Sequence, residues 1–487
     1  MFENEKKHWL ETAESLKPVL RKENVRPIAG MPDHALTENE SVILDFGNHY
    51  VGRITLKLSY QGSHPDAPAW LAVKFCENER ELNESAQDYH GWISKGWIQQ
   101  EAIHVDVLPA EVSLPRRYAF RFVKIDVLAL SSKYQLVIED AAAVTTTGAD
   151  DAAVEEIPLT PEDARIDQVS LRTLRSCMQD FFEDGPKRDR RLWLGDLRLQ
   201  ALTNSVTYRN FDLVRRCLYL FAGTADENGR LAACLFTEPA VEADDTFMFD
   251  YSLFFIPTLL NYFTASGDKE TLHDLLPVAL RQLELAEEAF DPETQMLRDF
   301  DDPRKCFVDW VLELNKQTAG HAIWIYCAEA ALRLSPDPAL EEKIRLRREA
   351  ARRCRYNEEK HLFVSGPAGQ VSWASQVWAV LAGIIDGEEA VKCLESVGKE
   401  PGAIPMVTPY MMHHYVEALC KIGNRQKAIQ VIREYWGAMV KAGADTFWEL
   451  FNPANPDESP YGSPIVNSYC HAWSCTPSWF LRSGILE

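Results

Sequence analysis

The stretch GADDAAVEEIPLTPED, residues 148–163, divides this chain of 487 residues into two parts of different character. It is acidic and contains two prolines, which is typical of a connection between domains. Before it, apolar and polar residues alternate as in strands, and after it the apolar residues recur at helical spacing. The chain is also too long for one ordinary hydrophobic core. The sequence therefore predicts a β-domain followed by a larger helical domain.

Residues 40–147 are predicted to form an antiparallel β-sandwich. Short runs of alternating apolar and polar residues at regular spacing are typical of that architecture. In this division residues 1–39 are an N-terminal extension and residues 148–164 are a linker. The runs are SVILDFGNHYVGRITLKLSYQG (41–62), AWLAVKFCENE (69–79), EAIHVDVLPAEVSL (101–114), AFRFVKIDVLAL (119–130) and YQLVIEDAAAVTTT (134–147).

Residues 165–487 are predicted to form an (α/α)6 barrel. The second helix of each successive pair tends to be the more apolar, as in MFDYSLFFIPTLLNYF and WASQVWAVLAGI. The pairs share no repeat motif, so a simple solenoid is not favoured. Six helical hairpins closed into a ring, with the apolar helices inside, explain both the count and the alternation. Twelve helices are expected near residues 166–182, 195–208, 210–223, 246–265, 268–290, 309–333, 339–354, 372–385, 387–397, 407–421, 424–442 and 466–483.

Composition excludes several classes of function. The formal net charge of −22 argues against partners made of nucleic acid or anionic membrane. The first twenty residues lack the apolar segment of a signal peptide, and no run of about 18 apolar residues predicts a membrane span. The eleven cysteines are scattered and form no CxxC pair, which favours reduced thiols in a cytoplasmic protein. No metal-ligand pattern or glycine-rich nucleotide loop is present, so no metal or cofactor is expected.

Four predicted loops are rich in both carboxylates and aromatic residues. Sugar faces stack on aromatic rings, sugar hydroxyls bind carboxylates, and a pair of carboxyl groups can cleave a glycosidic bond. Each loop alone also has a plainer interpretation, since Asp184 or Asp196 could cap a helix and His471 could be a core histidine. The loops are EDGPKRDRRLWLGDLR (183–198), FTEPAVEADDTFMFDYS (236–252), FVDWVLELN (307–315) and GADTFWELFNPANPDESPYGSPIVNSYCHAW (443–473).

Taken together, the motifs resemble the α-L-rhamnosidases of glycoside hydrolase family 78. The segment DGPKRDRRLWLGD (184–196) is similar to the family signature. The similarity continues in the family's order through FDYSLFFIPTLLNYF, FVDW, SQVWAVLAGI, TPYMMHHYVEALCKIG, GADTFWE and NSYCHAWSCTPSWFL, and it covers roughly residues 40–487. The resemblance implies an inverting glycoside hydrolase that releases a terminal α-L-rhamnose or related sugar from a small glycoside or oligosaccharide.

The resemblance also implies roles for individual residues. Asp189 falls at the position of the general acid, and Glu449 falls at that of the general base. Inversion requires roughly 6.5–9.5 Å between two such carboxyl groups, so that a water fits between them. The residues implied in binding the sugar are Asp184, Arg188, Trp193, Asp196, Asp250, Asp309, Trp310, Trp448 and His471.

The chain departs from the family pattern in two ways. The usual acid is glutamate, whereas Asp189 is shorter by one carbon–carbon bond, about 1.5 Å. A misplacement of that size can cost on the order of 10²-fold in rate. The chain also stops at SWFLRSGILE, directly after the last predicted helix, and lacks the extra β-domains of typical members. These features predict a short member of the family that acts on small substrates.

Two alternatives remain open at this point. The first is a hydrolase or lyase directed at uronic acids on the same barrel, because Lys187, Arg188 and Arg191 could bind a carboxylate. The second is a catalytically degenerate protein that only binds sugar, because the acid position holds Asp189. An acidic helical surface with a β-sandwich beside it is also compatible with a homodimer.

Overall fold

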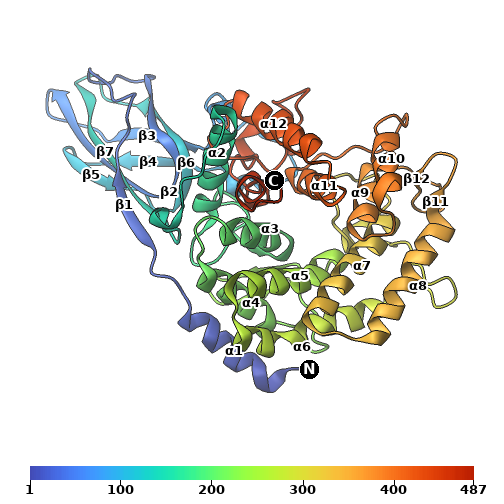
Figure 1. Cartoon of the computed structure of the whole chain (residues 1–487). Coiled ribbons are helices and arrows are strands. Elements are labelled where there is room, and N and C mark those ends of the chain that lie inside the picture. The colour runs from blue at the N-terminus through green and yellow to red at the C-terminus, as the bar shows by residue number, and fades with distance from the viewer. Residues whose placement is uncertain (487) are drawn as a thin grey trace.

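The computed structural model describes residues 1–486 and contains a β-domain followed by a helical domain (Figure 1). All strand pairs of the β-domain are antiparallel. Its strands are β1 (Arg21–Val25), β2 (Ser41–Gly62), β3 (Ala69–Cys76), β4 (Gln100–Val105), β5 (Ala110–Ser113), β6 (Tyr118–Ala129) and β7 (Tyr134–Thr147).

The long strand β2 is shared between the two layers of the β-domain. Its first half pairs with β6, which continues into β3 and β4, and its second half pairs with β7 and β5. The two halves meet at Gly52, where a Cβ atom would lie 2.4 Å from the Val144 carbonyl oxygen. The layers enclose a core that includes Leu56, Leu71 and Phe120. The predicted antiparallel β-sandwich is therefore confirmed.

The N-terminal segment contributes to both domains. Strand β1 adds to the sandwich beside β7. Helix α1 (Glu3–Ser15), which the sequence analysis did not predict, packs on the helical domain through buried Trp9 and Ala13. The Arg216 guanidinium donates to the Ala13 carbonyl, and Gly223 permits close packing because a Cβ there would lie 2.6 Å from Leu10 Cγ. The N-terminal segment, which precedes the β-domain in sequence, thus packs on the helical domain that follows the β-domain.

Up to residue 486, the helical domain contains the twelve helices expected. They are α2 (Pro161–Cys177), α3 (Leu194–Ser205), α4 (Phe211–Gly223), α5 (Phe249–Ser266), α6 (Lys269–Ala286), α7 (Gln317–Leu334), α8 (Pro338–Arg355), α9 (Trp373–Leu381), α10 (Gly387–Val397), α11 (Pro409–Lys421), α12 (Arg425–Lys441) and α13 (Pro477–Arg482). Short strands lie in the loops: β8 (Leu192–Trp193), β9 (Cys234–Phe236), β10 (Glu242–Ala243), β11 (Tyr356–Asn357) and β12 (Leu362–Phe363).

The helices form two concentric layers (Figure 1). The inner helices α3, α5, α7, α9, α11 and α13 contact one another in succession or through the turn before α13, and α12 returns to α2 to close the barrel. Inner helix α9 is buried along almost its whole length, from Ala374 to Leu381, whereas outer helix α8 buries one face only. The alternation of apolar and amphipathic helices is the sequence signal of this barrel, and the prediction of an (α/α)6 barrel is confirmed.

The largest differences from the predicted helix boundaries are at the starts of two helices. The helix expected from residue 309 begins at Gln317, because the Asp250 and Asp309 carboxyl groups accept backbone N–H groups of the preceding loop. The helix expected over 466–483 is reduced to α13, which begins at Pro477. Proline is favoured at the first helical position, and the residues before it form a loop at the mouth of the barrel.

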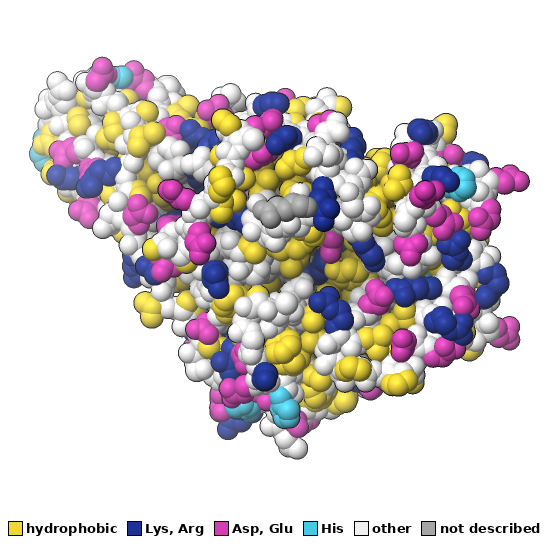
Figure 2. All heavy atoms as spheres, viewed as in Figure 1, with side chains coloured by type: hydrophobic (Ala, Val, Ile, Leu, Met, Phe, Trp, Pro, Cys, Tyr) yellow, Lys and Arg dark blue, Asp and Glu magenta, His cyan; other side chains and the backbone are white. Residues whose placement is uncertain are grey.

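Charged side chains of both signs are interspersed with hydrophobic ones over the face in Figure 2. Along residues 1–486, no helix combines the length and apolar composition that crossing a bilayer would require.

A buried polar cluster around Asp445 joins the two domains. Asp445, with 5% of its side chain exposed, accepts hydrogen bonds from the Arg172 guanidinium of α2 and, at 2.6 Å, from the His49 backbone N–H of β2. The His49 ring contacts Ser176 Oγ at 2.9 Å and Glu77 Oε1 at 3.1 Å. This polar junction fixes the sandwich against the first helix of the barrel.

We expect Asp445→Ala to destabilise the protein by about 3–5 kcal/mol, because it leaves Arg172 buried without its partner. The free energy of unfolding in urea, followed by tryptophan fluorescence, measures this effect. Asp140→Ala is the matched control, since Asp140 pairs with Arg26 at the surface and such pairs contribute little. Equal destabilisation by the two variants would contradict the role given to the junction.

Candidate active site

The predicted site residues converge at the end of the barrel where the inner helices begin. Asp196 lies in the first turn of α3 and Asp250 in that of α5. Asp309 precedes α7, and Glu449 and His471 precede α13. All five residues are buried. Because the inner helices run parallel to one another, loops far apart in sequence meet at this one end.

Arg188 is the centre of the site. Its Nη2 donates to Glu449 Oε2 at 2.6 Å, and its Nη1 lies 4.0 Å from Asp189 Oδ1. Its Nε donates to the Val466 carbonyl at 2.8 Å. The side chain is almost completely buried, so this guanidinium supplies a fixed positive charge between the two carboxyl groups predicted to act as acid and base.

Glu449 is held on both sides. Tyr461, which the sequence analysis did not single out, donates its hydroxyl to Glu449 Oε1 at 2.6 Å, and the Arg188 guanidinium stacks on the Tyr461 ring at 4.2 Å. Burial raises the pKa of Glu449 above its ordinary value, while the Arg188 charge and the Tyr461 hydrogen bond act in the opposite direction. The carboxyl group is thus oriented by two donors in a site that disfavours its charged form.

Asp184 shapes the loop that carries Asp189. Its two carboxyl oxygens accept the backbone N–H groups of Asp189 at 3.0 Å and Arg191 at 2.9 Å. Arg190 supports the same loop by donating to the carbonyls of Pro186 at 2.9 Å and Arg117 at 3.0 Å. Arg190 thus holds this loop by binding backbone carbonyls.

Burial disfavours the charged forms of two carboxyl groups of the site. Burial, with the Asp189 charge in addition, raises the pKa of Asp184 to about 8. Burial, with the charges of Asp184 and Glu449, raises the pKa of Asp196 well above its ordinary value. Burial and then the Arg188 charge lower the pKa of His471, so its ring is neutral. The site therefore avoids packing several negative charges together.

Several buried polar atoms of the site have no hydrogen-bond partner within residues 1–486. They are Asp196 Oδ1, His471 Nδ1 and Trp448 Nε1. The His471 ring lies between two acids, with Nδ1 3.6 Å from Asp196 Oδ1 and Nε2 3.9 Å from Asp184 Oδ2. Buried polar groups are normally paired, so these atoms offer hydrogen bonds to the hydroxyl groups of a ligand.

Asp250 and Asp309 differ from the other acids because the protein itself uses their oxygens. Asp250 is fully buried and accepts the backbone N–H groups of Phe307 and Val308 at 2.9–3.0 Å. The Asp309 carboxyl group accepts hydrogen bonds from the Thr408 hydroxyl at 2.6 Å and from the Val407 N–H at 3.0 Å. Burial raises the pKa of Asp309 to about 6, against these hydrogen bonds. Both acids hold the loop at the start of α7.

The three predicted tryptophans lie at different depths. Trp310 is 40% exposed and meets Phe307 edge to face at 5.8 Å. Trp193 is partly buried and meets Tyr251 edge to face at 6.2 Å. Trp448 is buried, and its indole Nε1 has no hydrogen-bond partner among the described residues.

The β-domain also reaches the site. Lys187, in the first loop, pairs with Glu81 of the β-domain at 2.5 Å, and both side chains are 1% exposed. Gly91 packs so closely on the loop of Tyr461 that a Cβ there would lie 1.9 Å from the Tyr461 carbonyl oxygen. The sequence gives no signal for these contacts, because they depend on how two separate loops are folded.

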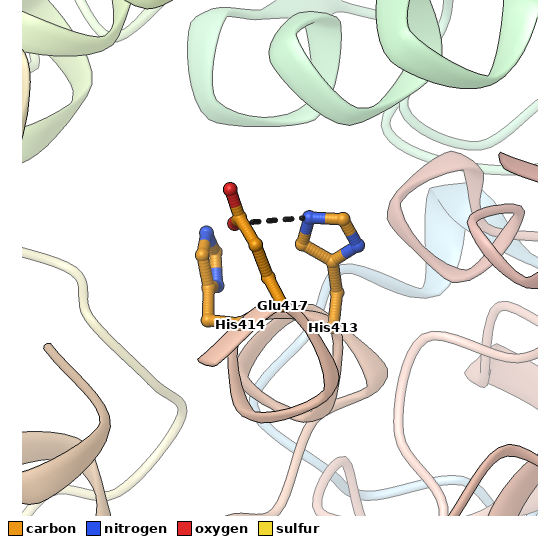
Figure 3. A group of neighbouring side chains, drawn as sticks. All are labelled: His413, His414 and Glu417. Atoms are coloured by element: carbon orange, nitrogen blue, oxygen red, sulfur yellow. Dashed lines mark ion pairs between the residues drawn. The ribbon is translucent and has the colours of Figure 1, made fainter. Parts of the chain in front are cut away.

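A second polar cluster lies on α11, deeper in the barrel. The ligand-type atoms of His413, His414 and Glu417 lie within 4.8 Å of one another (Figure 3). Arg198 of α3 donates to His414 Nε2 at 2.8 Å and to Glu417 Oε2 at 3.3 Å. Burial would raise the pKa of Glu417, but the Arg198 charge and His413 outweigh it and lower the pKa. Arg198 thus supplies the positive charge of this cluster, which opposes the binding of a second cation.

Comparison with known families identifies both domains. The model of the glycosyl hydrolase family 78 alpha-rhamnosidase N-terminal domain matches residues 10–145. The model of the bacterial alpha-L-rhamnosidase 6 hairpin glycosidase domain matches residues 163–485, which is more than half of the chain. No curated protein sequence matches this chain.

Solved structures agree with the family models. The chain is similar to a rhamnosidase from Klebsiella oxytoca with rhamnose bound, at 45% identity over 98% of each chain and a TM-score of 0.95. A family 78 rhamnosidase of Bacillus sp. GL1 shares the fold, at 21% identity over 91% of this chain and 46% of that chain and a TM-score of 0.76. The Streptomyces avermitilis α-L-rhamnosidase complexed with L-rhamnose also shares the fold, at 15% identity over 96% of this chain and 44% of that chain and a TM-score of 0.69. The chain belongs to glycoside hydrolase family 78, the α-L-rhamnosidases with a six-hairpin glycosidase domain.

Proposed function

We propose that this glycoside hydrolase releases terminal α-L-rhamnose with inversion, using Asp189 as general acid and Glu449 as general base. The position of Arg188, 2.6 Å from Glu449 and 4.0 Å from Asp189, carries this proposal. Because the outer nitrogens of a guanidinium are about 2.3 Å apart, the nearest oxygens of the two carboxyl groups lie within about 9 Å of each other. That limit is compatible with the roughly 6.5–9.5 Å of an inverting pair. The rhamnose bound to the Klebsiella oxytoca protein supports the choice of sugar.

In the proposed reaction Asp189 donates a proton to the glycosidic oxygen as the bond from that oxygen to the sugar C1 breaks. Water attacks C1 from the opposite face, and Glu449 accepts the proton that this water loses. Arg188 keeps Glu449 in place through the reaction. The proton of Asp189 ends on the leaving group, and Glu449 ends protonated, so solvent must restore both groups before the next turnover.

Sugar recognition is assigned to the uncharged groups around this pair. Protonated Asp184 and Asp196 can each donate and accept a hydrogen bond, and neutral His471 can do the same, which matches the hydroxyl groups of a sugar. Trp193, Trp310 and Trp448 add ring and N–H contacts. Asp250 and Asp309 act indirectly in this proposal, by holding the loop that presents Trp310.

The proposal is favoured over uronic-acid chemistry at the same position. Lys187 is paired with Glu81 and Arg188 with Glu449, so two of the three bases considered for a uronate are already engaged. A binding protein without activity remains a testable outcome, because the family's usual glutamate is replaced by Asp189.

The proposed function is tested with an aryl α-L-rhamnoside in a proton NMR tube. We expect the β-anomer of L-rhamnose to appear first and to equilibrate later, as inversion requires. If the α-anomer appears first, inversion is wrong. If rhamnose is bound in calorimetry but no glycoside is cleaved, the protein is a binding protein.

The roles of acid and base predict different dependences on the leaving group. Glu449→Gln should reduce turnover about 10²-fold or more on every substrate, since the water loses its base. Asp189→Asn should reduce turnover of a rhamnosyl disaccharide by a similar factor. It should reduce turnover of a 2,4-dinitrophenyl rhamnoside much less, because that leaving group needs little protonation.

Steady-state kcat on the two substrates measures this difference. The exposed Asp212→Asn on α4 is the control, and Asp189→Glu tests the family's usual residue. Full activity of Asp189→Asn on the disaccharide would transfer the acid role to Asp184 or Asp196.

Tyr461 predicts a change in pH dependence. Its hydroxyl stabilises the charged form of Glu449, so Tyr461→Phe should raise the pKa of Glu449. A base must be deprotonated, and the acidic limb of the profile of kcat/KM against pH should therefore move to higher pH. Tyr469→Phe is the control, since Tyr469 bonds to Asn467 and not to Glu449. An unmoved acidic limb in Tyr461→Phe would show that this hydrogen bond does not tune the base.

A further inference from the structure

A cleft of about 700 Å³ lies between the sandwich and the barrel. Its volume is within the usual range for sites that bind small molecules. Residues of β1, β2 and β7 line one side, and the loops at 179–183, 189–191 and 236–238 line the other. Both domains are therefore needed to form it.

The cleft touches the active site through one residue, Asp189, which is among its lining residues whereas Glu449 is not. The Asp189 side chain is 27% exposed, while that of Glu449 is 6% exposed. In an inverting hydrolase the acid faces the leaving group and the base faces water on the other side of the sugar. If Asp189 is the acid, the leaving group must lie on the side of this cleft.

The wall of the cleft carries an excess of unpaired positive charge, although the chain has a formal net charge of −22. Three of the four lining acids are already paired, Glu183 with Arg117 at 2.8 Å, Asp180 with Lys17 at 3.4 Å and Asp189 with Arg188 at 4.0 Å, and only Glu238 has no ion pair within the described chain. Within the described chain, no ion pair engages the lining bases Lys22, Arg53, Arg190 and Arg191.

Arg191 is the best placed of these bases. Its guanidinium lies 4.4 Å from the centre of the Phe236 ring, which also lines the cleft. Stacking of this kind fixes the plane of the guanidinium, whose N–H groups match a carboxylate in a bidentate contact. Arg191 is also two residues from Asp189, so an anion bound by it is close to the proposed acid. Trp97 and Phe181 add apolar surface for a ring.

We infer that this cleft receives the leaving group and selects one that carries a carboxylate on a ring, such as a uronic acid or an aromatic acid. The inference rests on the proposed function and extends it to the second half of the substrate. The rhamnose ring itself remains among the neutral groups at the barrel mouth, so the negative charge that the arginines favour belongs to the leaving group and not to the sugar released.

Two matched pairs of substrates test the inference and separate the two sources of the carboxylate. The first pair is rhamnosyl-(1→4)-glucuronic acid and rhamnosyl-(1→4)-glucose. The second pair is the rhamnoside of 4-(2-carboxyethyl)phenol and that of 4-propylphenol. The carboxylate of the first lies too far from the phenol oxygen to change the pKa of the leaving group strongly. We expect kcat/KM to be about tenfold higher for the acid of at least one pair, mainly through KM, and the ratio to fall as salt is added.

In Arg191→Gln, the ratio of kcat/KM for the acidic substrate to kcat/KM for its neutral partner should fall close to one. This ratio does not depend on the fraction of enzyme that is folded, because that fraction cancels. Arg230→Gln is the matched control: Arg230 is also partly buried and lies over an aromatic ring, Phe247 at 5.7 Å, but it does not line the cleft. The control should keep the ratio of the unmodified enzyme.

The outcomes distinguish this inference from the proposed function. Cleavage of both members of each pair at equal kcat/KM overturns the inference and leaves the rhamnosidase function intact. A preference for the acid that survives Arg191→Gln also overturns it. If no rhamnoside is cleaved at all, the proposed function fails and the inference fails with it. A preference confined to the disaccharide pair identifies a uronic acid, and one confined to the aryl pair identifies an aromatic acid.

Discussion

The contact between Arg188 and Glu449 joins two loops that are 261 residues apart in sequence. One loop belongs to the first helical hairpin and the other to the last, so the contact forms only when the barrel has closed. A buried guanidinium without its carboxylate is strongly destabilising. Each loop is therefore folded correctly only in the presence of the other, and the orientation of the site's carboxyl groups follows from the closure of the ring of helices.

The β-domain also supports the loops of the site. Glu81 neutralises Lys187 beneath the first loop, and the segment around Gly91 packs against the loop that carries Tyr461. Through these contacts the sandwich supports both the acid side and the base side of the site. The β-domain thus positions groups at the mouth of the barrel.

The fold was largely predictable because burial leaves a local pattern in the sequence. The alternation in β2 and the apolar length of α9 are visible without any knowledge of their partners. Helix α1 was missed because only Trp9 and Ala13 are buried along it. The segment from Asp309 has helical spacing, yet it is a loop. Asp250, from a distant helix, accepts the N–H groups of Phe307 and Val308 just before it, and Asp309 itself accepts the Trp310 N–H. The residues gathered at the site were predicted from the order of their motifs, whereas Tyr461 and the polar cluster at Arg198 depend on tertiary contacts that no spacing reveals.

The position of α1 has a consequence for synthesis of the chain. Its partner α4 begins at Phe211, so about 200 residues must be translated after α1 before the two can pack. At the usual rates of translation this takes about 10–40 s. During that interval Trp9 has no core to enter, while the whole β-domain, which lies between the two helices, can emerge from the ribosome and fold. Helix α1 therefore docks only after the β-domain that follows it in the chain has emerged, and Trp9 stays exposed until then.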